Sequence, residues 1–74
     1  MKKYALVEAE YCGADVTIFD TKEDAQIALQ KAYTYAQRDM KSHPEDSYIT
    51  ESNALVKSDY VEDLWYGVIK EIEL

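Results

Sequence analysis

The chain has 74 residues with fifteen acidic and eight basic side chains, a net charge of −7, and 47% hydrophobic residues. A field of that sign repels phosphate backbones and anionic lipids, which disfavours binding to nucleic acid or to a membrane surface. The lone cysteine allows no internal disulfide, and no apolar run reaches the roughly 18 residues of a membrane span. The length and the mixed composition predict a single folded domain over residues 1–74.

The first twenty residues predict a hairpin. Residues 4–10 alternate between two sides, and residues 16–19 are β-branched and aromatic, so each segment reads as a strand. Residues 11–15 form a short connection with Gly13 at its centre, which favours antiparallel pairing of the two strands. Glu8 and Glu10 interrupt the apolar stretch that a signal peptide requires, so a cytoplasmic location is expected.

A helix is predicted after the hairpin. The segments 20–23 and 21–24 both place an N-cap residue three positions before an acid, which is typical of a helix start. Apolar residues then recur at spacings of three and four and form one stripe: Ala25, Ala28, Leu29, Ala32, Ala36 and Met40. The residue before a proline avoids helical angles, so His43-Pro44 is expected to end the helix.

The C-terminal half predicts further strands. Residues 45–53 are a polar connection with room for an irregular extended piece, residues 54–57 a short strand, residues 58–59 a turn and residues 61–74 a long final strand. A bulge near residues 67–70 would change which side of the last strand faces the helix, and the pattern leaves this open. The predicted fold is α+β in the order ββαββ, a four-stranded, mainly antiparallel sheet with a helix packed on one face.

A helix on one face leaves the other face of the sheet uncovered. If Ala5, Val7 and Ala9 pack on the alanine stripe, the uncovered face carries apolar and acidic side chains in about equal number. These predicted partner-binding residues are Tyr4, Leu6, Glu8, Glu10, Phe19, Trp65, Ile69, Glu71 and Glu73. An apolar patch beside acids is typical of a protein-interaction surface, although coverage by long side chains and by residues 45–53 is the alternative.

Candidate chemistry is sparse. Cys12 and His43 match no nucleophile motif and are too few for a structural zinc site, and no glycine-rich phosphate loop is present. We therefore expect no catalytic residue, metal or cofactor, and a protein that is not an enzyme. If the first and last strands are neighbours, Glu8, Glu10, Glu71 and Glu73 would cluster, either to bind a cation weakly or to mimic phosphates. Solubility explains the same acids.

The segments Val16–Ala25 and Leu64–Leu74 resemble parts of small acidic proteins encoded by bacterial prophages and mobile elements, which share a strand, a D-T-x-E-x-A helix entry and a final strand containing tryptophan. The resemblance implies a protein that binds a host or phage protein, and it carries over no functional residues. The main hypothesis is a noncatalytic protein-interaction module that presents an acidic, aromatic sheet face to a protein partner. The alternatives are a homodimeric structural domain and an inhibitor that mimics nucleic-acid phosphates.

Overall fold

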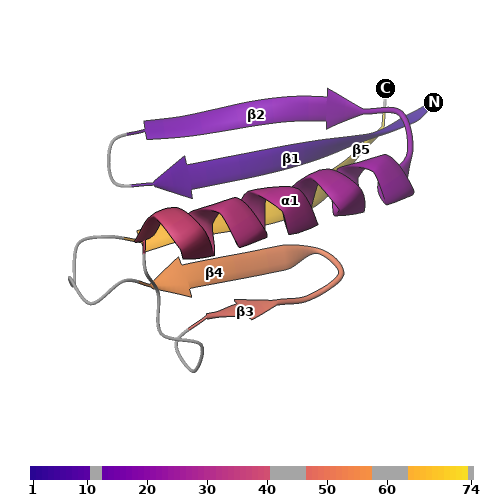
Figure 1. The fold of residues 1–74 in the computed structure, drawn as a ribbon. Coiled ribbons are helices and arrows are strands. Elements are labelled where there is room, and N and C mark those ends of the chain that lie inside the picture. The colour runs from indigo at the N-terminus through magenta and orange to yellow at the C-terminus, as the bar shows by residue number, and fades with distance from the viewer. Residues whose placement is uncertain (11–12, 41–46, 58–63, 74) are drawn as a thin grey trace.

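A computed structural model describes residues 1–10, 13–40, 47–57 and 64–73, and it is an α+β fold in which a helix lies across an open sheet (Figure 1). The elements follow in the order β1 (Lys2–Glu10), β2 (Gly13–Phe19), α1 (Lys22–Met40), β3 (Tyr48–Ile49), β4 (Asn53–Lys57) and β5 (Leu64–Glu73). The described residues hold five strands where the sequence pattern predicts four. The additional strand, β3, is the extended piece expected within residues 45–53.

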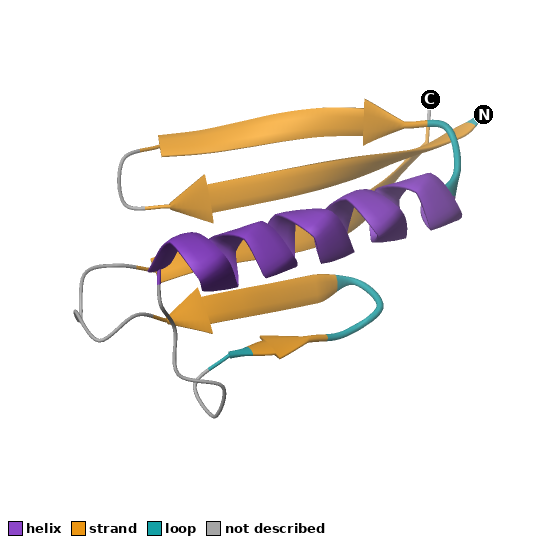
Figure 2. Ribbon diagram, viewed as in Figure 1, coloured by secondary structure: helices purple, strands orange, loops and turns teal. Residues whose placement is uncertain are grey.

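The sheet is antiparallel throughout its described pairs, with the strand order β2-β1-β5-β4-β3. The predicted hairpin is confirmed, because β1 and β2 pair from Tyr4 with Phe19 to Glu10 with Gly13. The last strand returns beside the first and places β1 and β5 at the centre, while β2 and the two-residue β3 form the edges. Loops and strands are distinguished in Figure 2.

The start of α1 follows from a side-chain cap. The Thr21 hydroxyl accepts a hydrogen bond from the Asp24 amide at 3.2 Å, which satisfies one of the amides that the first turn leaves without a helical partner. Glu23 and Asp24 lie in that first turn, where the helix dipole favours negative charge. Of the two caps that the sequence allows, the structure uses Thr21. The predicted stop at His43-Pro44 lies outside the described residues.

The core lies between α1 and one face of the sheet. Its buried members come from α1 and from β1, β4 and β5: Leu6, Ala25, Leu29, Ala36, Ala54, Val56, Trp65 and Ile69. The predicted helix stripe is confirmed at Ala25, Leu29 and Ala36, with Ala28 and Ala32 partly buried against the same cluster. Among the described helices, none is both long and apolar enough to cross a membrane.

The last strand runs without a bulge. Its pairing with β1 is continuous from Trp65, opposite Glu10, to Glu73, opposite Lys2. The side of the sheet that each β5 residue occupies is therefore set by simple alternation. Trp65 and Ile69 point to the helix, and Tyr66, Val68 and Lys70 point away from it.

Candidate functional site

The apolar residues predicted to bind a partner lie under the helix. Leu6, Trp65 and Ile69 are 2%, 6% and 8% exposed, and Tyr4 and Phe19 are partly buried against the same cluster. The prediction that these five side chains line the uncovered face is wrong. Ala5, Val7 and Ala9, which were expected to meet the helix, alternate with Leu6 and so lie on the opposite side of the sheet.

The physical reason for this orientation is complementary volume. The buried stripe of α1 is mainly alanine, and small side chains on one surface require large ones opposite to reach the packing density of a protein interior. Leu6, Trp65 and Ile69 supply that volume, which alanines at positions 5 and 9 do not. At Gly67 the absence of a side chain makes room for large neighbours, because a methyl group there would lie 2.8 Å from both Leu29 Cδ1 and Trp65 Cη2. The helix and the indole ring occupy the space that glycine leaves.

The four glutamates predicted at the site all lie on the helix side of the sheet, but they are divided between its two ends. Antiparallel pairing sets Glu71 opposite Tyr4 and Glu73 opposite Lys2, whereas Glu8 and Glu10 lie opposite Gly67 and Trp65 toward the other end. The predicted four-carboxylate cluster is therefore wrong, although β1 and β5 are neighbours. Glu71 accepts a hydrogen bond from the Tyr4 hydroxyl at 3.5 Å and lies 3.5 Å from Lys2 Nζ. The described residues hold no group of acids, histidines or cysteines that could bind a metal ion.

The face of the sheet turned away from α1, called here the open face, is mostly apolar. Its side chains follow from the strand register: Ala14, Val16 and Ile18 on β2; Lys3, Ala5, Val7 and Ala9 on β1; Leu64, Tyr66, Val68, Lys70 and Ile72 on β5; Asn53, Leu55 and Lys57 on β4; and Tyr48 on β3. Val16 is 61% exposed, Ile18 51%, Tyr48 45% and Tyr66 37%. Apolar side chains line up across neighbouring strands, as in the row from Ala9 through Tyr66 and Leu55 to Tyr48.

The charge on the open face is opposite in sign to that of the whole chain. Its described strand positions hold three lysines, Lys3, Lys57 and Lys70, and no carboxylate. Lys3 is paired with Asp20, the residue that follows β2. The carboxylates of the described strands all alternate onto the helix side, among them Glu8, Asp15 and Glu71. The fold therefore separates an apolar face with lysines from an acidic margin around the helix.

The sequence contains a signal for the open face that the prediction did not use. On each of β1, β2 and β5, the residues alternate between two sides of the strand. All the carboxylates lie on one side, and the other side has none. The alanine-rich stripe of the helix, which calls for large partners such as Leu6 and Trp65, is the second signal. The first pattern separates the two faces of each strand without saying which one is covered, and the second is consistent with the face that carries Leu6 and Trp65.

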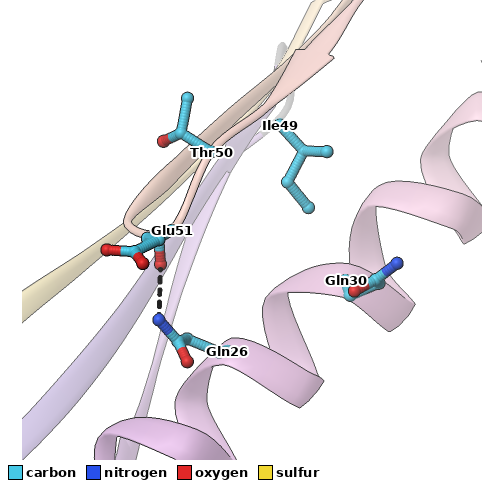
Figure 3. A pocket seen from close by; sticks show the side chains of 5 residues that line it. All are labelled: Gln26, Gln30, Ile49, Thr50 and Glu51. Carbon is cyan, nitrogen blue, oxygen red and sulfur yellow. Dashed lines mark hydrogen bonds between the residues drawn. The ribbon is translucent and has the colours of Figure 1, made fainter.

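Two shallow depressions formed by described residues border the helix, and their described lining holds no catalytic arrangement. In the first, shown in Figure 3, Gln26 Nε2 donates to the Glu51 carbonyl oxygen at 3.3 Å, beside Gln30, Ile49 and Thr50. Glu51 is the titratable residue of this lining, and amides do not exchange protons as an acid or base does near neutral pH. Cys12 and His43 lie outside the described residues.

The second depression lies on the outer face of α1. Gln30, Thr34 and Tyr35 line it together with Lys31 and Arg38. The exposed helix face carries these two cations and Ile27, which is 55% exposed. Exposed cations of this kind are well solvated and give no ligand geometry by themselves.

Comparison of the chain with protein-family models, with curated proteins and with solved structures gives no match.

Proposed function

We propose that the chain is a noncatalytic protein-interaction module and that its open face is the binding surface. The observation that carries this proposal is a broad, mainly apolar sheet face that none of the described elements covers. Exposed apolar patches of this kind usually mark sites where another protein binds, since burying them removes apolar surface from water. Tyr66 and Tyr48 add the aromatic side chains that interfaces favour, because each is large, stiff and half polar.

The charge of the open face supports a partner with an acidic surface. Lys57 and Lys70 lie on an apolar surface without a carboxylate among its described strand positions, so a partner surface with an apolar centre and carboxylates around it is complementary. The chain as a whole is negative, but at physiological salt the field of charges farther away than about 8 Å is largely screened. At contact the nearby lysines therefore have more influence than the distant acids.

This proposal keeps the protein-binding function expected from the sequence and replaces the surface that performs it. Leu6, Trp65 and Ile69 stabilise the fold and are too buried to contact a partner. The phosphate-mimic hypothesis needs a row of free carboxylates, and no observation supports one, because Glu71 is paired with Lys2 and the other acids are divided between two ends of the sheet.

Affinity capture with matched variants tests the proposal. The immobilised chain is exposed to an extract of the cells that make it, in parallel with Tyr66→Ser, which removes apolar area from the open face. Ile27→Ser is the control, because Ile27 is an exposed apolar residue on the opposite side of the molecule. We expect a protein that is retained by the wild type and by Ile27→Ser and is lost with Tyr66→Ser.

Charge variants test the acidic character of the partner. Lys70→Glu should weaken retention of that protein more than Lys70→Gln does, since the first introduces repulsion and the second removes attraction only. Circular dichroism and thermal unfolding establish that each variant is folded. Equal retention by Tyr66→Ser and the wild type, or loss of the protein with Ile27→Ser, would contradict the proposal.

A further inference from the structure

Among the described residues, no strand pairs with the outer edge of β2. In the sheet order, β2 pairs with β1 and lies at the end of the sheet, and Figure 1 shows it along the outer margin. Residues 13–18 of this strand are all exposed. Proteins usually protect such edges with lysine, proline, a bulge or a very short strand. The opposite edge, β3, has only two residues, whereas β2 has seven and contains neither lysine nor proline.

The register shows which backbone groups of β2 face outward. The Ile69 amide donates to the Ser52 carbonyl at 2.7 Å, so the backbone N–H and C=O groups of Ile69 point toward β4. The backbone groups of its neighbours Val68 and Lys70 therefore point toward β1. Backbone groups alternate in direction along a strand, and paired residues of an antiparallel ladder either exchange both hydrogen bonds or neither.

Carrying the alternation across β1 gives the direction of each β2 residue. The backbone groups of Val7, which lies opposite Val68, point to β5. Those of Leu6 and Glu8 therefore point to β2, where their partners are Thr17 and Asp15. The residues of β2 whose N–H and C=O groups face away from the sheet are therefore Ala14, Val16 and Ile18. These groups have no partner strand among the described residues.

We propose that this edge pairs with the same edge of a second copy of the chain, antiparallel and with a two-fold axis at Val16. In this register Val16 lies opposite Val16 of the second copy, and Ala14 lies opposite Ile18. The outward backbone groups of Ala14, Val16 and Ile18 then meet the outward backbone groups of the second copy, and each residue pair exchanges both backbone hydrogen bonds. The two sheets become one continuous sheet, with both helices on one side and both open faces on the other.

The side chains of β2 complement one another in this register. Asp15, the one charged residue of the strand, lies opposite Thr17, so no like charges are directly opposed. Phe19 lies opposite Gly13 of the second copy, and the position above Gly13 is open, since a methyl group there would have nothing within 4 Å. An aromatic side chain placed across from an edge glycine is a known way to stabilise such a pair. A strand centred on Val16 is thus complementary to itself along its full length.

Charge sets the conditions for this association. Each copy carries a net charge of −7, so two copies repel one another at low salt and the dimer should strengthen as salt is added. This is the reverse of what is expected for the open face with its acidic partner, where salt screens an attraction. The salt dependence therefore separates the two surfaces.

Charge complementation at Val16 tests the proposal and its register. Val16 is 61% exposed, so Val16→Lys and Val16→Glu leave the monomer core unchanged. Each variant alone places like charges opposite one another at the two-fold axis, whereas a mixture of the two places opposite charges there. Sedimentation equilibrium from about 1 μM to about 1 mM measures the dissociation constants. We expect a wild-type dimer, at least tenfold weaker self-association of each variant, and recovery of the dimer in the mixture.

Two further measurements keep the outcome specific to this edge. Val16→Pro removes the amide at the axis, which the monomer does not use, and should weaken the dimer about tenfold or more, while Val16→Thr keeps the amide and the dimer. In the wild type, amide exchange at Ala14, Val16 and Ile18 should slow as the protein concentration rises. A wild type that stays monomeric to 1 mM, a Lys–Glu mixture no heavier than its components, or a dimer that survives Val16→Pro would overturn the proposal. Val16 also belongs to the open face, so the proposed function is tested separately with the variants of Tyr66 and Lys70 on β5, which leave β2 unchanged.

Discussion

Replacing Gly67 with alanine should destabilise the protein strongly for so small a change. Gly67 lies on β5 between Trp65 and Ile69, on the side that faces α1. A methyl group at this position would lie 2.8 Å from Leu29 Cδ1 and 2.8 Å from Trp65 Cη2. Favourable carbon contacts are about 3.5–4.0 Å long, so one of the two side chains or the helix must move.

The size of the effect follows from how little room the neighbours have. Leu29 is 1% exposed and Trp65 is 6% exposed, so both are enclosed by other core residues. Overpacking of a tight core costs about 1–3 kcal/mol, and the enclosure of both neighbours indicates a value of about 2 kcal/mol. A core of this size supplies roughly 3–5 kcal/mol in total, so the substitution should remove about half of it. The midpoint of thermal unfolding should fall by roughly 10 °C.

Urea unfolding of Gly67→Ala, followed by Trp65 fluorescence and circular dichroism at low micromolar concentration, measures this loss. Gly13→Ala is the matched control, because a methyl group there meets nothing within 4 Å, and it should leave the stability unchanged or slightly higher. Adding Gly67→Ala to Leu29→Ala should cost less than it does in the wild type, since the space vacated by leucine accommodates the new methyl group. Wild-type stability in Gly67→Ala, or an equal loss in Gly13→Ala, would refute this account of the close packing.

Three other predictions have expected outcomes in the same unfolding assays. Leu29→Ala should destabilise the protein by about 2–5 kcal/mol and Ile27→Ala by less than about 0.5 kcal/mol. Similar losses at the two positions would contradict the assignment of Leu29 to the buried side of α1 and of Ile27 to the exposed side. Thr21→Ala should cost about 1 kcal/mol through loss of the N-cap, with Thr21→Ser close to the wild type, and an equal loss in both would argue against the cap. Asp20→Asn should cost less than about 1 kcal/mol at low salt and less still at high salt, because the Asp20 side chain that pairs with Lys3 is 79% exposed. A loss that persists at high salt would contradict this view.

The sequence was sufficient for most of the local structure. Alternation over residues 4–10, the short connection at Gly13 and the capping pattern at Thr21 predicted the hairpin and the helix, and local hydrogen bonding and side-chain period are enough to specify these. The two-residue strand β3 is too short to show a period, so it was seen only as an irregular extended piece. The pairing of β5 with β1 depends on contacts between the two ends of the chain, which no local pattern records.

The candidate surface could not be predicted from alternation alone, because both sides of β1 carry apolar residues: Leu6 on one side, Ala5 and Val7 on the other. A period of two divides a strand into two sides without saying which one a helix will cover.

What the amino-acid order determined by itself is the set of elements and the polarity of each strand side. The tertiary structure decided which side became the core, because the alanine face of α1 is filled by Leu6, Trp65 and Ile69, with Gly67 leaving room for Leu29 and the indole ring. The same choice placed the strand carboxylates beside the helix, and it left an apolar face with lysines and the outer edge of β2 uncovered by the other described elements.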